Sequence, residues 1–302
     1  MKILSDTCRP ECDTFATIGF FDGVHLGHQY LLEQLKMASA TNGLLPLVVS
    51  FANRPSEFFH PEHSTPLLSP PEEKLTRFEC VGIKHCLLLD FNAPIAKLTS
   101  KEFMTMLQQR YRVRQLLVGY NHHFGSDRRA TFNDYRLFGQ EVGIRVSACS
   151  ERREGDFFVS SSSIRQLLDA GDISTANRLL GYKYQLVGSV VDGEKTGRTI
   201  GFPTANLCIS PQKLIPKNGV YAVRVELKNR FYRGMLNIGM RPTVGGKQLS
   251  VEVHLLDFSG DLYGETLVVN LTARLRDEQK FDSLDTLKHQ LQNDCDTVRR
   301  EY

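Results

Sequence analysis

The first 182 residues alternate short apolar runs with amphipathic stretches. The runs at 14–18 and 45–51 are apolar and β-branched, which is typical of strands buried in a sheet. Between them, residues 28–41 carry apolar side chains at helical spacing, and this order predicts a βαβ unit with a parallel sheet. Further strands are predicted at 84–91, 115–120 and 144–149, and further helices at 71–81, 100–111 and 131–142. The alternation favours an open, doubly wound α/β sheet.

After Tyr182 the pattern changes to strands without helices between them. Strands are predicted at 184–191, 219–227, 230–239, 249–258 and 266–275. Such a series favours an antiparallel barrel or sandwich. An amphipathic segment at 283–298 predicts a terminal helix packed against it, and two short helices are predicted at 161–170 and 173–180. The pattern divides the chain into domains of residues 1–182 and 183–302.

Length and composition agree with two globular domains. The chain has 302 residues, of which 41% are hydrophobic and 24% charged, and this excludes a wholly disordered protein. Its net charge of +3 is too small to predict nucleic-acid binding, and we interpret the arginines at 110–114 as a cationic helix end. Seven cysteines without a Cys-x-x-Cys pair, and no apolar run long enough for a membrane span, predict a cytoplasmic protein.

Glycines and histidines gather directly after the first predicted βαβ strand. Gly19, Gly23 and Gly27 allow the backbone to turn and to approach a ligand closely, while His25 and His28 project from one face of the helix that begins there. A helix N-terminus with two imidazoles is suited to hydrogen bonding with a phosphate whose charge grows during attack. The alternative is a tight turn with two incidental histidines.

A second glycine-rich segment, residues 193–206, opens the all-strand part. Lys195 and Arg198 are suited to phosphates, and Thr204 and Asn206 lie two apart, so that their oxygens face one side of an extended chain and suit Mg²⁺. The alternative is an ordinary turn and strand start. Glu252 lies in an otherwise apolar strand at 250–256, where a carboxylate needs a reason, and the alternative is an outward-facing residue.

The segment from Gly19 to His28 is similar to the Gly-x-Phe-Asp-Gly-x-His-x-Gly-His motif of the nucleotidyltransferase superfamily, in the version found in bacterial bifunctional riboflavin kinase/FAD synthetases. Residues 118–125 and 159–165 resemble two further motifs of that family. The resemblance implies that His25, His28 and Arg165 stabilise the transferring phosphate. It implies flavin binding by Asn121 and nucleotide binding by a further set: Gly19, Phe21, Gly23, Gly27, Ser161 and Ser162. The chain departs from the family at Ala52-Asn53-Arg54, where Pro-His-Pro is usual and only Pro55 matches.

Residues 197–206 resemble the Gly-Arg-x-x-Gly-x-Pro-Thr-Ala-Asn motif of riboflavin kinases. The resemblance implies that Thr204 and Asn206 bind Mg²⁺–ATP, that Glu252 is the catalytic base and that Arg276 contacts the flavin. It implies nucleotide binding by another set: Lys195, Gly197, Arg198 and Gly201.

The family resemblance implies a doubly wound, Rossmann-like nucleotidyltransferase domain followed by an antiparallel β-barrel kinase domain with a terminal helix. The expected substrates are riboflavin, FMN and ATP, the expected product is FAD, and Mg²⁺ is the expected cofactor. No nucleic-acid or membrane partner is expected, and the oligomeric state is not predicted. Two alternatives are an enzyme with one live site, most plausibly the kinase, and a non-catalytic flavin-binding or RNA-associated module.

Overall fold

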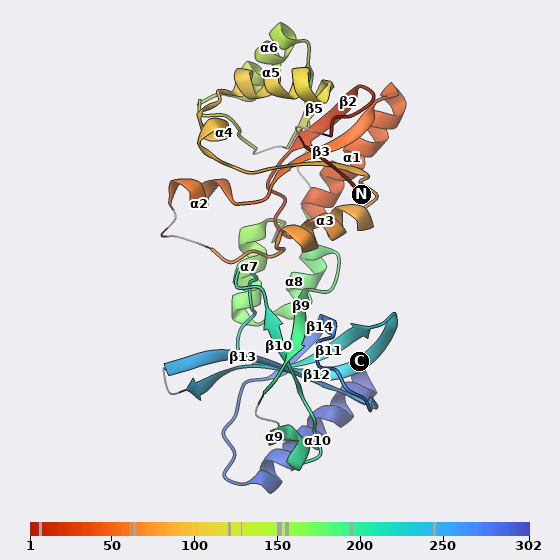
Figure 1. The fold of residues 1–302 in the computed structure, drawn as a ribbon, viewed down its shortest axis with the longest axis vertical. Helices are drawn as coiled ribbons and strands as arrows, with labels where there is room; N and C mark the ends of the chain where they lie inside the picture. The colour runs from red at the N-terminus through yellow and green to blue at the C-terminus, as the bar shows by residue number, and fades with distance from the viewer. Residues whose placement is uncertain are drawn as a thin grey trace. The chain divides into compact units, whose positions relative to one another are not determined.

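The computed structural model describes residues 1–5, 8–60, 62, 65–119, 122–127, 129–149, 153–154, 157–193, 196–243 and 246–302. The chain forms two compact units, residues 1–160 and 161–302, and each is described by itself (Figure 1). The first unit has the predicted alternation of strands and helices, and the second contains a barrel. The predicted domain boundary at residues 182 and 183 stays a prediction.

The first unit is built on a six-stranded parallel sheet with the order β1-β4-β3-β2-β5-β6. Its strands are β1 (Lys2–Leu4), β2 (Thr14–Ile18), β3 (Leu45–Phe51), β4 (His85–Leu89), β5 (Val113–Val118) and β6 (Arg145–Ala148). Its helices are α1 (Leu26–Asn42), α2 (Pro55–Phe59), α3 (Pro71–Cys80), α4 (Ala93–Lys97), α5 (Ser100–Tyr111) and α6 (Phe132–Val142). A short hairpin of β7 (Arg153–Glu154) and β8 (Phe157–Phe158) follows. The doubly wound fold is confirmed.

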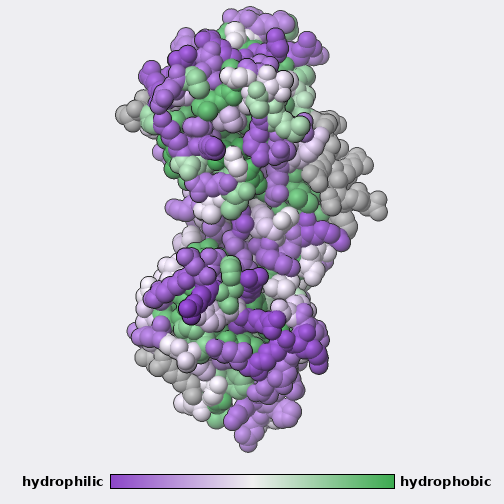
Figure 2. Space-filling model, turned by 90° about the vertical axis from the view of Figure 1, so that its right-hand side faces the viewer, coloured by the Kyte–Doolittle hydropathy of each residue, from purple (hydrophilic) through white to green (hydrophobic). Residues whose placement is uncertain are grey.

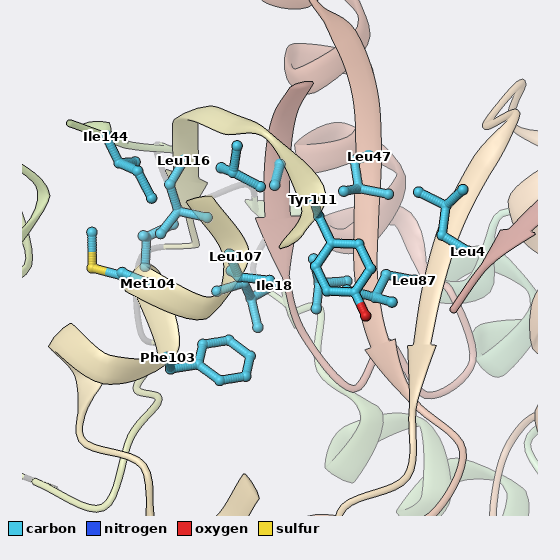
Figure 3. Close-up of a cluster of buried hydrophobic side chains, with 14 of the residues drawn as sticks. Leu4, Ile18, Leu47, Leu87, Phe103, Met104, Leu107, Tyr111, Leu116 and Ile144 are labelled. Atoms are coloured by element: carbon cyan, nitrogen blue, oxygen red, sulfur yellow. The ribbon is translucent and has the colours of Figure 1, made fainter. Parts of the chain in front are cut away.

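Side chains that alternate along the central strands are buried on both faces of this sheet. In β2, Phe15 packs into the cluster formed with α1 and α3, whereas Ala16 and Ile18 pack into the cluster formed with α5. Figure 3 shows the second cluster, in which Phe103 and Leu107 of α5 lie over the sheet. Because both faces are buried, the central strands β2 and β3 are mostly apolar along their length, as the sequence pattern predicts.

The second unit contains a closed barrel with the strand order β10-β13-β12-β11-β14-β9, paired antiparallel throughout. Its strands are β9 (Gln185–Val191), β10 (Ala205–Ile209), β11 (Gly219–Leu227), β12 (Arg230–Thr243), β13 (Gly246–Leu255) and β14 (Thr266–Arg276). Lys228 and Asn229, both with positive φ, form the β11–β12 turn. The barrel fold is confirmed, and β10 is a strand that the sequence pattern did not predict.

Within the described residues, four helices accompany the barrel. They are α7 (Ser161–Ala170), α8 (Ile173–Leu180), the single turn α9 (Thr196–Thr199) and the terminal α10 (Leu284–Glu301). The buried Asn177 ties α8 to the barrel, because its amide donates to Leu271 O at 3.0 Å and accepts from Tyr184 N at 2.7 Å. Cys295 and Val298 of α10 pack against Ala222 and Met235, so the predicted terminal helix is confirmed.

Hydrophilic residues cover most of the face drawn in Figure 2, with hydrophobic side chains scattered among them. Among the described residues, no helix combines the length and the apolar character that crossing a membrane requires.

Candidate active sites

The sheet of the first unit has a switch point between β2 and β5. From β2 the sheet extends through β3 and β4 on one side, and through β5 and β6 on the other. Ligands of open α/β sheets bind at the carboxyl ends of the strands beside such a switch. His25 and His28 follow β2 at the start of α1, and His122 follows β5. The topology therefore places three histidines at the carboxyl-terminal ends of the strands.

His25 and His28 form a stacked pair, with ring centroids 3.6 Å apart and an interplanar angle of 18°. His25 is the N-cap of α1, and its Nδ1 accepts from His28 N at 3.4 Å. Burial lowers the pKa of His25 to about 4. Burial, followed by the charges of His25, His122 and Lys74, lowers the pKa of His28 well below its usual range. Both imidazoles are therefore neutral at pH 7 and offer hydrogen bonds to a ligand.

Phe21 supports this pair from the core. Its ring is 3% exposed and meets His28 edge-on, with centroids 5.1 Å apart. A Cβ on Gly19 would lie 2.8 Å from the Phe21 ring, so a larger residue there would displace the ring. Phe21 thus contacts His28 in this structure, and nucleotide binding by Phe21 and Gly19 stays a prediction.

Gly23 and Gly27 shape the backbone between β2 and α1. Gly23 has a φ of 79°, a conformation that favours glycine. A Cβ on Gly27 would lie 3.2 Å from the His25 ring, so glycine lets this ring lie back over the first turn of the helix. Their predicted contact with the nucleotide remains untested.

An ion pair that the sequence did not predict lies beside the histidines. Asp22, 3% exposed, accepts from Arg54 Nη2 at 3.1 Å and from Ser69 N at 3.0 Å. Arg54 belongs to the segment where the chain departs from the pattern of the family that it resembles. The structure therefore gives this departure a role, because Arg54 compensates the buried carboxylate of the glycine-rich loop.

A buried lysine joins the ends of β2 and β3. Lys74 is 1% exposed and donates to Phe20 O at 3.2 Å and to Phe51 O at 2.6 Å. Its Nζ lies 4.3 Å from the centroid of the Phe20 ring, a cation–π arrangement. Burial lowers the pKa of Lys74 to about 8, so the group remains mainly positive at pH 7. Through these contacts, Lys74 holds both the backbone and the ring of Phe20 near the carboxyl-terminal end of β2.

An aromatic cavity of about 530 Å³ opens beside Phe20. Such a volume and lining are typical of a small-molecule site. Its aromatic and imidazole lining consists of Phe20, Phe51, Phe59, Phe91, Phe103, His122, His123 and Phe124. Six phenylalanines from separate segments cannot be assigned to one cavity from sequence alone, because their spacing is irregular. Asn121, the predicted flavin contact, lies outside the described residues.

The predicted phosphate-binding arginine lies on α7. Ser161 begins this helix, Ser162 is exposed, and Arg165 follows about one turn later with a partly buried side chain. All three residues belong to the second compact unit, whereas the histidine pair belongs to the first. Phosphate binding by Arg165 and nucleotide binding by the two serines therefore stay predictions.

The barrel brings Glu252, Thr204 and Asn206 together at one place. Asn206 of β10 is the register partner of Glu252 of β13. Thr204 Oγ1 donates to Glu252 Oε2 at 2.9 Å, and Ser250 Oγ donates to Glu252 Oε1 at 3.1 Å. The hydroxyl that donates to Glu252 keeps its lone pairs for a cation. The Thr204 hydroxyl and the Asn206 amide supply oxygen donors of the kind that suits Mg²⁺, and the Glu252 carboxylate lies beside them.

Two glycines of the glycine-rich segment 193–206 make room for Thr204, Asn206 and Glu252. A Cβ on Gly193 would overlap Asn206 Nδ2, so the Asn206 amide packs directly on the backbone of the loop. A Cβ on Gly197 would overlap Phe202 O, and Phe202 N donates back to Gly197 O at 2.8 Å. This hydrogen bond therefore closes a turn between Gly197 and Phe202, directly before β10.

The remaining residues of that loop are described only in part. Gly201 has a φ of 87°, which explains a glycine at this turn. Lys195 lies outside the described residues, and of Arg198 only the backbone is described, within α9. Their predicted contacts with phosphate, and that of Gly201, remain untested.

A second cavity, of about 240 Å³, adjoins Thr204. Asp261 and Tyr263 line it from the segment after β13, and Val253 lines it from the strand itself. Because Thr204 lines this cavity and donates to Glu252, a ligand in the cavity would lie next to the carboxylate, within one unit.

Arg276 is held by an ion pair. Its Nε donates to Asp294 Oδ2 at 3.0 Å, its Nη2 donates to the same oxygen at 2.8 Å, and Nη1 donates to Asp277 O at 3.1 Å. Both side chains of the pair are largely buried, at 15% and 7% exposure. The fork joins β14 to α10, and a direct flavin contact by Arg276 stays a prediction.

Comparison with known proteins places both units in described families. A family model for FAD synthetase matches residues 9–163, and a model for riboflavin kinase matches residues 180–302. The bifunctional riboflavin kinase/FMN adenylyltransferase of Escherichia coli is 38% identical over 97% of this chain and 94% of its own length. The enzyme of the same name from Bacillus subtilis is 35% identical over 94% and 91%.

A solved structure has the same fold. The crystal structure of a Streptococcus pneumoniae protein, named as a macrolide-efflux protein, matches with a TM-score of 0.89 and 33% identity, over 97% of this chain and 96% of that one. The motifs, the two folds and the full-length relatives agree, and the chain belongs to the family of bifunctional riboflavin kinase/FMN adenylyltransferases.

Proposed function

We propose that the chain carries out two successive reactions, phosphorylation of riboflavin to FMN at the barrel and adenylyl transfer from ATP to FMN at the α/β unit. The observation that carries the first reaction is the hydrogen bond from Thr204 to Glu252 beside Asn206. The observation that carries the second reaction is the stacked pair of neutral histidines at the carboxyl-terminal end of β2, in the same unit as the aromatic cavity.

In the kinase reaction, Glu252 takes the proton of the riboflavin 5′-hydroxyl as the oxygen attacks the γ-phosphorus of ATP. The new bond joins this oxygen to phosphorus, the bond from phosphorus to the bridging oxygen breaks, and ADP leaves. The Thr204 hydrogen bond orients the carboxylate, since it fixes Oε2 at 2.9 Å. Thr204 and Asn206 would hold Mg²⁺, and a bound Mg²⁺ would neutralise charge on the phosphates.

In the adenylyl transfer, a phosphate oxygen of FMN attacks the α-phosphorus of the second ATP, and pyrophosphate leaves. Charge grows on the oxygens of the α-phosphate during this attack. His25 and His28, neutral at pH 7, donate N–H hydrogen bonds to these oxygens, and the N-terminus of α1 adds its partial positive charge. The aromatic cavity is large enough for the tricyclic ring of the flavin, which stacks on phenylalanine rings.

The proposal is tested by incubating the whole chain with Mg²⁺–ATP and either riboflavin or FMN, followed by chromatographic separation of the flavins. Riboflavin should give FMN and then FAD, and FMN should give FAD. Formation of FMN without FAD would contradict the adenylyl transfer and support the enzyme with one live site. Absence of both products would contradict both reactions and favour a binding module.

A further inference from the structure

His122 is a histidine for which the reactions above give no role. It follows β5 at the carboxyl edge of the sheet, across the switch point from the histidine pair. Its Nε2 is buried and has no hydrogen-bond partner within the described part of the chain. A buried polar atom without a partner costs about 1–3 kcal/mol, so a histidine at such a position calls for an explanation.

The His122 ring is held in place by its surroundings. Its backbone N donates to Gly119 O at 3.1 Å. The ring lies nearly parallel to that of Phe124, at an interplanar angle of 24° and a centroid distance of 6.3 Å. Phe124 in turn stacks on Tyr135 at 4.4 Å, and Tyr135 Oη accepts from Phe124 N at 3.2 Å. The imidazole therefore has a defined orientation before any ligand binds.

His122 has two kinds of neighbour. It lines the aromatic cavity together with Phe124. It also follows β5, which pairs directly with β2, and β2 leads to His25 and His28. His28 Nδ1 is likewise buried and has no hydrogen-bond partner among the described residues. His122 thus lies where the cavity and the histidine pair approach each other.

The imidazole of His122 is neutral at pH 7. Burial, followed by the charge of His123, lowers the pKa of His122 to about 4. Whichever tautomer is present, one ring nitrogen donates and the other accepts. A ligand hydroxyl can satisfy either tautomer, because it both donates and accepts, whereas a phosphate oxygen without a proton only accepts.

FMN has hydroxyl groups between its two ends. If the flavin ring occupies the cavity and the phosphate meets His25 and His28, the ribityl chain spans the distance between them. We propose that His122 binds the ribityl chain of FMN by a hydrogen bond from or to Nε2, as a substrate-contact residue that aligns the phosphate for attack. The inference rests on the proposed adenylyl transfer and deepens it.

The test compares FMN with a flavin phosphate whose ribityl chain is replaced by a pentyl chain of the same length without hydroxyls. Adenylyl transfer to each substrate is measured for the wild type, His122→Phe and His122→Gln, with the whole chain and Mg²⁺–ATP. Phenylalanine keeps an aromatic ring beside Phe124 and removes the hydrogen bond, whereas the glutamine amide retains hydrogen-bonding capacity. The readout is the ratio of kcat/KM for FMN to kcat/KM for the analogue, which does not depend on the fraction of folded enzyme.

The wild type should prefer FMN, and His122→Phe should reduce this preference by about three- to tenfold, the value of one hydrogen bond. His122→Gln should restore part of it. His60→Phe, which changes an exposed histidine of the same unit, should leave the preference unchanged. In each variant, phosphorylation of riboflavin should remain at the wild-type rate.

Two outcomes would overturn the inference while leaving the adenylyl transfer intact. One is a preference in His122→Phe that stays within twofold of the wild type. The other is a lower kcat for both substrates with an unchanged preference, which would mean that His122 acts by positioning His28. If the wild type forms no FAD from FMN, the proposed function itself fails, and this inference fails with it.

Discussion

The imidazole rings of His25 and His28 stack at 3.6 Å, and this contact excludes a state in which both rings are protonated. Two imidazolium groups so close together would repel each other strongly in a buried site. Their depressed pKa values arise mainly from burial. Protonation of His25 or His28 should therefore affect both the stability of the first unit and its proposed reaction.

The first unit should lose stability as the pH falls below about 6.5. The unfolded chain binds a proton on each histidine near this pH, whereas folded His25 binds one only near pH 4. The contribution of His25 is therefore complete above the unfolded pKa and is lost between pH 6.5 and about 4, and it amounts to about 3 kcal/mol. Burial lowers the pKa of His28 in the same direction, so protonation of His28 adds to this loss.

The variant His25→Asn isolates this effect, because asparagine is a good N-cap and does not titrate. The free energy of unfolding of the first unit can be measured from hydrogen-exchange protection of β2 and β5 in urea, at pH 7 and pH 4.5. The wild type should lose more stability than the variant between these two pH values. An equal loss would contradict the assigned protonation states.

The ion pair between Asp22 and Arg54 should make a large contribution to the stability of the first unit. Arg54→Ala leaves the carboxylate of Asp22, 3% exposed, without its guanidinium. Loss of one partner of a buried pair costs about 3–5 kcal/mol. Urea unfolding followed by hydrogen exchange would detect this loss.

A matched control is the exposed pair of Lys2 and Glu11, 3.4 Å apart. Exposed pairs contribute about 0–1 kcal/mol, so Lys2→Ala should change stability by less than 1 kcal/mol. Similar small losses in both variants would mean that Asp22 does not depend on Arg54.

Gly193→Ala should impair the kinase without affecting the adenylyl transfer. The new Cβ would overlap Asn206 Nδ2 and would displace the Asn206 amide from its place beside Glu252. The expected result is a fall of at least tenfold in riboflavin phosphorylation and a higher Mg²⁺ concentration for half-maximal rate. FAD formation from FMN serves as the internal control. A normal Mg²⁺ dependence would argue against Asn206 as a ligand.

The residues that sequence motifs predicted and those that they missed differ in a physical way. His25 and His28 share one helix turn, and Thr204 and Asn206 share one extended segment, so local geometry brings each pair together. Such pairs are visible in a sequence because their spacing is the period of a helix or strand. Asn206 and Glu252 lie in separate strands, and their assignment relied on the resemblance to a family.

The aromatic cavity and the buried cations were not predicted. Phe20, Phe91 and Phe124 lie in three segments that only the sheet order brings together. Lys74 lies in a helical pattern that favours an exposed lysine, and only the structure shows that it binds Phe20 O and Phe51 O. The Arg54–Asp22 pair joins two segments with no shared periodicity. Long-range packing of this kind has no signal in a single sequence.

The role of Arg276 can be separated from that of its partner. Arg276→Lys and Asp294→Asn should both destabilise the barrel, because each removes the fork that joins β14 to α10. If Arg276 acts only through this pair, the two variants should raise the KM for riboflavin to a similar extent. A selective increase of tenfold or more in Arg276→Lys would instead support the predicted flavin contact. Initial rates of FMN formation at varied riboflavin concentration measure the difference.

The central claim is that one chain contains two independent ATP-using sites, one centred on Glu252 and one on His28. The most direct measurement compares FMN formation from riboflavin and FAD formation from FMN in Glu252→Gln and His28→Asn. Glu252→Gln should lower FMN formation by about 10²–10⁴-fold with normal FAD formation, and His28→Asn should lower FAD formation by about 10²–10³-fold with normal FMN formation. Undiminished FMN formation in Glu252→Gln, or the loss of both activities in either variant, would contradict the account.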